Sequence, residues 1–189
     1  LEEIIPAVRR AAPHALIHCD AVQAAGKLPI RVESLDVDLL TVSGHKLHAP
    51  KGCGALYIKK GIRLLPRALG GEQEKKRRAG TEAMPLIAAF GAAIQALPDL
   101  REQDAHFRRL LRRLLDGLAC RDEVILHRPA NAVPYIVNLS VPGLRSETVL
   151  HFLSERGVMV SSGSACAKGA KSPVLTALGL PAPRIDSAL

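Results

Sequence analysis

Short apolar runs alternate with amphipathic stretches along the first half of the chain. The apolar runs at 15–19, 38–43 and 54–58 have the length and composition of buried strands. Between and around them, residues 1–12 show the spacing of an amphipathic helix, and residues 85–97 form an alanine-rich stretch that is typical of a buried helix. Strands that alternate with helices predict a layered α/β architecture.

The second half of the chain has a different pattern. Pro98 ends the alanine-rich stretch, and Asp99 is placed to cap a long helix that we expect to extend to about residue 119. Arginines and leucines take opposite faces of that helix. Beyond it we expect short strands around one helix: strands at 124–127, 135–141 and 158–160, and a helix at 146–155.

This change of pattern predicts a domain boundary near Pro98, with one domain over 1–98 and a second over 99–189. The chain begins at Leu1 inside a helical pattern and ends at Leu189 with no predicted closing element. We therefore interpret the sequence as a segment of a longer protein.

Composition and charge narrow the class of protein. The 189 residues include 48% apolar and 23% charged residues, which is typical of a globular chain, and the formal net charge is +8. Aromatic residues make up only 3% and tryptophan is absent, so a stacking platform for single-stranded nucleic acid is disfavoured. No apolar run is long enough to cross a bilayer, no signal peptide opens the chain, and the four cysteines form no CxxC pair. A reducing cytoplasm is the expected compartment.

Three groups of reactive side chains follow predicted strands. They are Asp20, the run Ser43-Gly44-His45-Lys46, and the loop that holds Cys166. Ligands gather at the carboxyl ends of strands in open α/β sheets, and a lysine that binds an aldehyde cofactor needs a phosphate grip and a carboxylate facing the ring nitrogen. Taken alone, such a lysine is more often a solvated surface residue, and a lone cysteine is more often an inert buried thiol.

Five blocks of sequence, in their order along the chain, carry a resemblance that favours the catalytic interpretation. The blocks are His18–Lys27, Val37–Lys46, Pro50–Tyr57, Gly70–Glu74 with Arg78–Glu82, and Ser161–Cys166. Together they resemble the pyridoxal-phosphate-dependent cysteine desulfurases of the class-V aminotransferase superfamily. The last block resembles the first of that family's two classes, which serves iron–sulfur cluster assembly and tRNA thiolation.

The resemblance implies a fold and a set of cofactor ligands. The fold would be part of an aminotransferase-like large domain, with a mostly parallel sheet and helices on both faces, followed by a smaller α+β domain. Lys46 resembles the lysine that carries pyridoxal phosphate covalently, and Asp20 the partner of the ring nitrogen. Gln23 resembles the donor to the ring's phenolic oxygen, and Ser43 and His45 resemble phosphate ligands.

The resemblance also implies a nucleophile and partners. Cys166, in the expected catalytic loop at 161–172, resembles the cysteine that takes sulfur from L-cysteine as a persulfide and leaves L-alanine. The same cysteine is a possible transient iron–sulfur ligand; no other metal site is expected. Thr81 resembles the threonine that reaches the phosphate of a neighbouring subunit's cofactor, which implies a homodimer. The expected partner is a sulfur acceptor, such as an iron–sulfur scaffold or a tRNA-thiolation protein, with no membrane and no direct nucleic-acid binding.

The sequence also departs from the family's pattern. The family's upstream phosphate-binding loop and stacked histidine have no counterpart here, nor has its substrate-carboxylate arginine. We therefore expect the isolated segment to bind cofactor weakly and to turn over poorly. Two alternatives stay open: a selenocysteine lyase or another enzyme of the aminotransferase fold, and, in a different class, a basic interaction module without catalysis that would explain the charge of +8.

Overall fold

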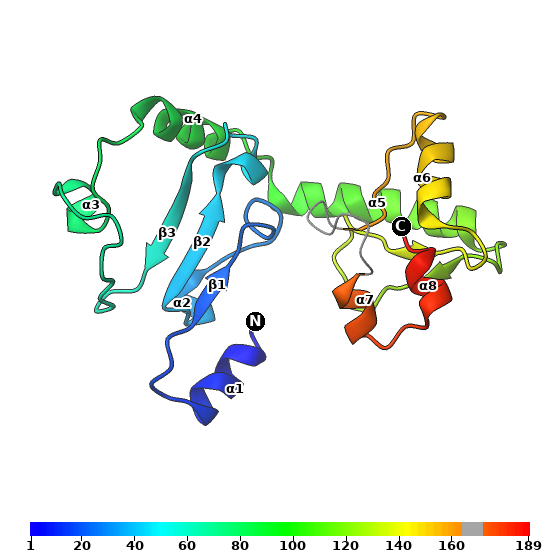
Figure 1. Ribbon diagram of the computed structural model, residues 1–189, viewed down its shortest axis with the longest axis horizontal. Helices are drawn as coiled ribbons and strands as arrows, with labels where there is room; N and C mark the ends of the chain where they lie inside the picture. The colour runs from blue at the N-terminus through cyan, green and yellow to red at the C-terminus, as the bar shows by residue number, and fades with distance from the viewer. Residues whose placement is uncertain (164–171) are drawn as a thin grey trace. The chain divides into compact units, whose positions relative to one another are not determined.

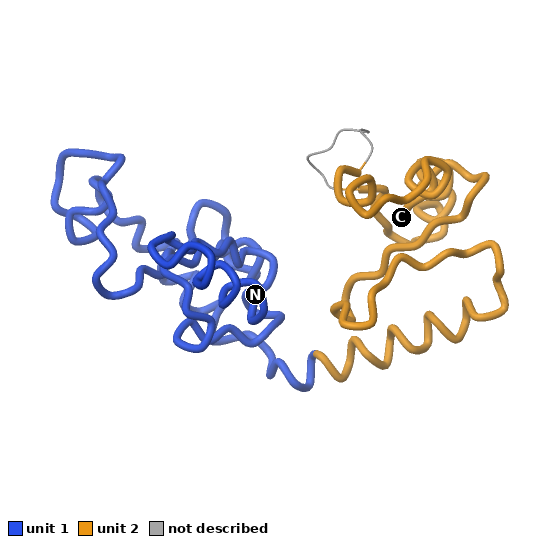
Figure 2. The backbone as a smooth tube through the Cα atoms, turned by 90° about the horizontal axis from the view of Figure 1, so that it is seen from below, with its two compact units in different colours: residues 1–103 blue, residues 104–189 orange. Residues whose placement is uncertain are grey.

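The computed structural model describes residues 1–163 and 172–189. The chain divides into two compact units, residues 1–103 and 104–189 (Figure 2). The division lies within helix α5 (Leu100–Leu118). The two units are defined only by which residues of this chain contact one another. The domain boundary near Pro98 therefore stays a prediction.

A three-stranded sheet forms the centre of unit 1 (Figure 1). Its strands are β1 (His18–Asp20), β2 (Leu39–Ser43) and β3 (Gly54–Ile58), in the order β1-β2-β3. The pair β1–β2 is parallel, and short helix α2 (Val32–Leu35) lies in the connection between them; the pair β2–β3 is antiparallel. The predicted α/β architecture is therefore confirmed.

The first strand is shorter than the sequence predicts. The Ile17 amide donates to the carboxylate of Asp38 at 2.8 Å rather than to a neighbouring strand, so regular pairing begins only at His18. The predicted strands at 38–43 and 54–58 agree with β2 and β3 to within one residue.

Helices cover the sheet through two apolar clusters. Helix α1 (Ile4–Ala11) buries Ile5 in a cluster that also holds Val37 and Leu40. Helix α4 (Met84–Gln95) buries Phe90 beside Leu47 in the second cluster. Because alternate residues of a strand point to opposite faces, Cys19, Leu40 and Val42 pack on these clusters while Asp20 and Thr41 face away from them.

Unit 2 contains most of α5 and a small two-stranded sheet, β4 (Ile125–Leu126) with β5 (Leu139–Ser140). The predicted cap of α5 is confirmed: Asp99 Oδ1 accepts hydrogen bonds from the amides of Arg101 and Glu102 at 2.8 and 3.1 Å. The remaining helices are α6 (Ser146–Ser154), α7 (Pro173–Ala177) and α8 (Ala182–Asp186).

One expectation for this half of the chain is wrong. Residues 158–160 form no strand: no described segment pairs with them, and Met159 is 77% exposed. Leu139 and Leu189 exchange two backbone hydrogen bonds of 3.1 and 2.8 Å, and an antiparallel bridge joins Ser140 to Ala188, so residues 188 and 189 lie beside β5. The expected strand at 135–141 is reduced to its last part, Leu139–Ser140.

The predicted nucleophile Cys166 lies outside the described residues. In the part of the chain that is described, no helix has the length and apolar character needed to cross a membrane.

Candidate active site

The carboxyl ends of β1 and β2 bring two predicted cofactor ligands to one edge of the sheet. Asp20 ends β1 and Ser43 ends β2, and the two strands are parallel. The register sets Asp20 opposite Thr41, and the Ala21 amide donates to the Thr41 carbonyl at 2.9 Å. The chain that leaves Asp20 is therefore held beside the strand that leads to Ser43.

A tight turn follows β2 and carries the next two ligands, His45 and Lys46. The turn is the 3-10 helix η1 (Gly44–Leu47). The Gly44 amide donates to the Cys53 carbonyl at 2.9 Å, which ties the turn to the start of β3. A Cβ atom on Gly44 would lie 2.7 Å from Cys53 Sγ and 3.2 Å from Cys53 O. Glycine is required here because the backbone passes so close to its neighbour.

Ser43 and His45 form a hydrogen-bonded pair. Ser43 Oγ and His45 Nδ1 lie 2.7 Å apart, although the turn places one residue between them. A hydroxyl and an imidazole at one turn offer the donors that an anionic oxygen prefers. The structure therefore brings together the two residues that the sequence predicts as phosphate ligands.

The side chains of Lys46 and Asp20 make few hydrogen bonds or ion pairs with the described residues. Lys46 is half-buried, and its amine has no hydrogen bond or ion pair with any described residue. Asp20 is exposed, and its Oδ1 accepts one hydrogen bond, from the Val22 amide at 3.0 Å; no other described group bonds to the carboxylate. An unpaired amine suits a nucleophile, and an unpaired carboxylate oxygen suits a cationic ring nitrogen.

The other two predicted ligands are less constrained. Gln23 lies in the turns that follow β1, and Thr81 in the segment before α4. Both side chains are exposed and make no hydrogen bond to the described part of the chain. Their roles stay predictions.

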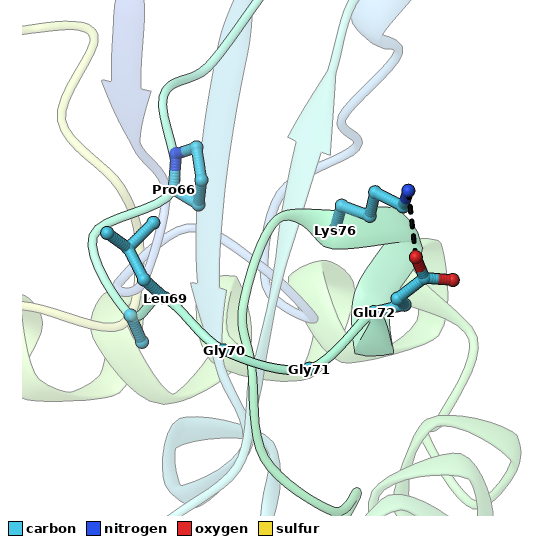
Figure 3. A pocket seen from close by; sticks show the side chains of 7 residues that line it. Pro66, Leu69, Gly70, Gly71, Glu72 and Lys76 are labelled. Atoms are coloured by element: carbon cyan, nitrogen blue, oxygen red, sulfur yellow. Dashed lines mark ion pairs between the residues drawn. The ribbon is translucent and has the colours of Figure 1, made fainter.

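The segment 66–76, which includes the loop that begins at Gly70, lines a separate open pocket (Figure 3). Its volume is about 260 Å³, and an ion pair of 2.8 Å joins Lys76 Nζ to Glu72 Oε1 at its side. The loop, predicted as irregular, contains the short turn α3 (Gln73–Lys76), in which Glu74, Lys75 and Lys76 have positive φ angles. Asp20, Ser43 and Lys46 do not line this pocket, so it is not part of the site at the sheet edge.

One contact at the sheet edge was not predicted from the sequence. His18 Nε2 and Thr41 Oγ1 lie 2.7 Å apart, across β1 and β2. His18 and Asp20 are two positions apart on a strand, which signals a shared face. The register that brings Thr41 to that face is a long-range property, so no local signal identifies the pair.

Comparison with known proteins identifies the family. The model of the aminotransferase class-V family matches residues 1–183. The chain belongs to the class-V aminotransferase family. Among curated relatives, it is 43% identical over 173 residues to cysteine desulfurase 2 of Trichormus variabilis and 42% identical over 168 residues to the cysteine desulfurase IscS of Methanosarcina thermophila. These matches cover 88% and 87% of this chain, but only 43% and 42% of the relatives.

Solved structures of NifS-like proteins agree with the fold. A NifS-like protein superposes with a TM-score of 0.86 at 33% identity, over 99% of this chain and 49% of that protein. A NifS-like protein from Rickettsia africae gives a TM-score of 0.84 at 28% identity, over 99% and 50%. The chain thus spans about half the length of the relatives and solved structures that it matches.

Class-V aminotransferases depend on pyridoxal phosphate, and the donor set at the sheet edge fits this cofactor. The unpaired amine of Lys46 suits an aldehyde, and the free oxygen of Asp20 suits a protonated ring nitrogen. The pair Ser43–His45 suits a phosphate, and Gly44 keeps the turn free of a side chain.

Proposed function

We propose that this chain carries the lysine-bearing part of the active site of a pyridoxal-phosphate-dependent cysteine desulfurase. The reaction would convert L-cysteine to L-alanine and leave the sulfur atom on Cys166. The observation that carries this proposal is the arrangement at one sheet edge: Asp20 ends one strand, and Ser43 leads from the neighbouring parallel strand directly into the turn with Lys46. The names of the relatives, each called a cysteine desulfurase, support the choice of substrate.

The cofactor, when bound, supplies an electron sink for a carbanion at the substrate's Cα. Asp20 would hold a proton at the ring nitrogen, because a carboxylate stabilises the charged form of a neighbouring base. Lys46 would bind the aldehyde through Nζ, and the same atom would later take the proton from the substrate's Cα. Ser43 and His45 would hold the phosphate, and Gln23 would donate to the phenolic oxygen.

The cysteine loop would perform the sulfur transfer. The thiolate of Cys166 attacks the sulfur atom of the substrate, a sulfur–sulfur bond forms, and the substrate's carbon–sulfur bond breaks. The electron pair of that bond stays on the carbon side, which is protonated to give alanine, and Cys166 keeps the transferred sulfur as a persulfide.

The partners follow from the same proposal. Thr81 would reach the cofactor phosphate of a second subunit, so the active assembly would be a homodimer. The persulfide sulfur would pass to an acceptor, either an iron–sulfur scaffold or a tRNA-thiolation protein, in the cytoplasm. During transfer to a scaffold, Cys166 would transiently ligate iron.

A substitution at the nucleophile tests the function. In the full-length protein, Cys166→Ser should keep the visible absorbance of bound pyridoxal phosphate and abolish sulfide release from L-cysteine with dithiothreitol as acceptor. The matched control is Cys120→Ser, because Cys120 is an exposed free thiol with no role in the proposed reaction, and it should leave sulfide release unchanged. Sulfide release that survives in Cys166→Ser would contradict the proposal and favour an enzyme of the same fold that breaks the carbon–sulfur bond without a cysteine nucleophile.

A further inference from the structure

Four arginines of helix α5 have no assigned role. They are Arg108, Arg109, Arg112 and Arg113, and all four are exposed. The helix buries Leu111, and the three- and four-residue spacing of the arginines places them beside one another on its exposed surface. All four belong to unit 2, so their arrangement does not depend on unit 1. We call this group the α5 arginine face.

Charge repulsion within the α5 arginine face is only partly relieved inside the protein. Arg108 pairs with Asp104, whose Oδ2 lies 2.6 Å from Arg108 Nε. The other three, Arg109, Arg112 and Arg113, form no ion pair with the described residues. Like charges three and four positions apart on a helix repel one another, as Arg109 does with Arg112 and Arg113. An anionic partner would relieve this repulsion, so the face is electrostatically complementary to one.

The surroundings of the face favour carboxylates over the phosphate backbone of a nucleic acid. Asp104 and Asp116 lie one helical turn before and beyond the arginines, and each would repel a continuous run of phosphates. Base stacking finds no support on α5, because its one phenyl ring, that of Phe107, packs against Tyr135 with 5.8 Å between the ring centres. A protein can instead present carboxylates to the arginines alone and leave other groups opposite the two aspartates.

We propose that the α5 arginine face is a docking site for an acidic helix or loop of another protein, whose carboxylates pair with Arg109, Arg112 and Arg113. A guanidinium presents its N–H groups in a planar fork that matches a carboxylate with two parallel hydrogen bonds. Three such pairs side by side select a partner whose acidic residues are also three or four positions apart. The inference is independent of the proposed function, because it needs neither the cofactor nor Cys166.

Binding of a synthetic peptide to the full-length protein tests the proposal. The probe is a fluorescent alanine-based helix with glutamates three and four positions apart, and fluorescence anisotropy measures its affinity at low ionic strength. Arg112→Glu and Arg113→Glu should each weaken binding about fivefold, because an attractive pair becomes a repulsive one. Added salt should weaken binding to the wild type. The matched control is Arg10→Glu, at an exposed arginine of α1, which changes the net charge equally and should leave the affinity unchanged.

Two further probes decide between specific docking and its alternatives. A peptide with lysines in place of the glutamates should bind Arg112→Glu and Arg113→Glu better than it binds the wild type. Absence of that gain, or an equal loss of acidic-peptide binding in Arg10→Glu, would overturn the proposal, because the attraction would then follow net charge alone. A tRNA that binds this face more tightly than the acidic peptide would overturn it in favour of a nucleic acid. A wild type that does not bind the acidic peptide at all would overturn it as well.

Discussion

Asp20 lies opposite Thr41 across the parallel strands β1 and β2, and the amide of Ala21 donates to the Thr41 carbonyl directly after that pair. The contact fixes where the chain leaves β1 relative to the end of β2. Asp20 is thereby held near the strand that leads into the Lys46 turn, although 26 positions separate these residues in the sequence. The site is therefore a consequence of strand register.

The closeness of Gly44 to Cys53 predicts a strict requirement for glycine. Gly44→Ala places a methyl group 2.7 Å from Cys53 Sγ and 3.2 Å from Cys53 O, so we expect a loss of about 1–3 kcal/mol in the free energy of unfolding. The turn with Lys46 should shift as well, because the added atom pushes it away from β3. Urea unfolding measures the loss, and reactivity of Lys46 with pyridoxal phosphate measures the shift.

Two companion variants control for the effect of adding a methyl group. Gly91 lies in α4 with nothing within 4 Å of an added Cβ, so Gly91→Ala should raise the free energy of unfolding by up to about 1 kcal/mol. In a Cys53→Ala background the sulfur is removed, and Gly44→Ala should cost less. An equal cost with and without the Cys53 sulfur would contradict the packing explanation.

A buried carboxylate links α1 to the sheet. Asp38 is 4% exposed; its Oδ2 accepts hydrogen bonds of 2.8 Å from the Arg9 guanidinium and from the Ile17 amide. Asp38→Asn should lower the free energy of unfolding by about 2 kcal/mol, because Arg9 loses its charged acceptor. Asp36→Asn is the matched control. Asp36 contacts Lys59 at 2.5 Å and the same Arg9 at 3.2 Å, but it is half-exposed, so its loss should cost less than about 1 kcal/mol.

The Asp38 carboxylate also predicts that the free energy of unfolding depends on pH in the acid range. The Ile17 amide and, after it, the Arg9 guanidinium hold the pKa of Asp38 below its ordinary value of 3.8. The stabilisation that the ionised Asp38 provides is therefore complete above its ordinary pKa. It is lost as the pH falls through the lower pKa that Asp38 has in the folded state. Acid titration of the unfolding free energy should show this loss in the wild type and a flatter profile in Asp38→Asn. Identical profiles would exclude Asp38 as a cause of acid unfolding.

In unit 2, a partly buried histidine predicts a different pH range. His127 Nε2 donates to Ser140 Oγ at 2.7 Å, because Ser140 itself donates to the Arg184 carbonyl at 2.5 Å. Burial, and then the charge of Arg184, lowers the pKa of His127 below its ordinary value of 6.5. Unit 2 should therefore lose stability as the pH falls below that value, because the unfolded state binds the proton more tightly.

Tyrosine fluorescence can follow this loss in unit 2. The chain has two tyrosines, so Tyr57→Phe leaves Tyr135 as the reporter. His127→Gln keeps a donor but cannot be protonated, and its unfolding free energy should change little between pH 7.5 and pH 5. A wild type that is equally stable at both pH values would contradict the role of His127 in the pH dependence.

A strained backbone follows the Lys46 turn. His48 has a φ of 64°, in the left-handed region that glycine adopts more easily than other residues. His48→Gly should therefore raise the free energy of unfolding by about 1 kcal/mol, and the β-branched His48→Val should lower it. Thermal unfolding of both variants measures the difference. A glycine variant less stable than the wild type would mean that the His48 side chain makes a stabilising contact.

The sequence predicted the elements whose signals are local. The β2 and β3 runs are apolar and short, and the Asp99 cap is a local signal that the structure confirms. The expected strand at 158–160 failed because its apolar residues find no partner strand in the described part of the chain. The links from His18 to Thr41 and from Arg9 to Asp38 were not predicted, because they join residues 23 and 29 positions apart. Such contacts depend on register and helix placement, which no local pattern encodes.

Covalent capture of pyridoxal phosphate is the sharpest test of the role proposed for Lys46. The full-length protein would be incubated with pyridoxal phosphate, reduced with borohydride, digested and mapped by mass spectrometry. We expect one modified peptide, labelled at Lys46; Lys46→Ala should lose the label, and Asp20→Asn should keep it with weaker cofactor binding. A label spread over several surface lysines, or one that persists in Lys46→Ala, would contradict the account.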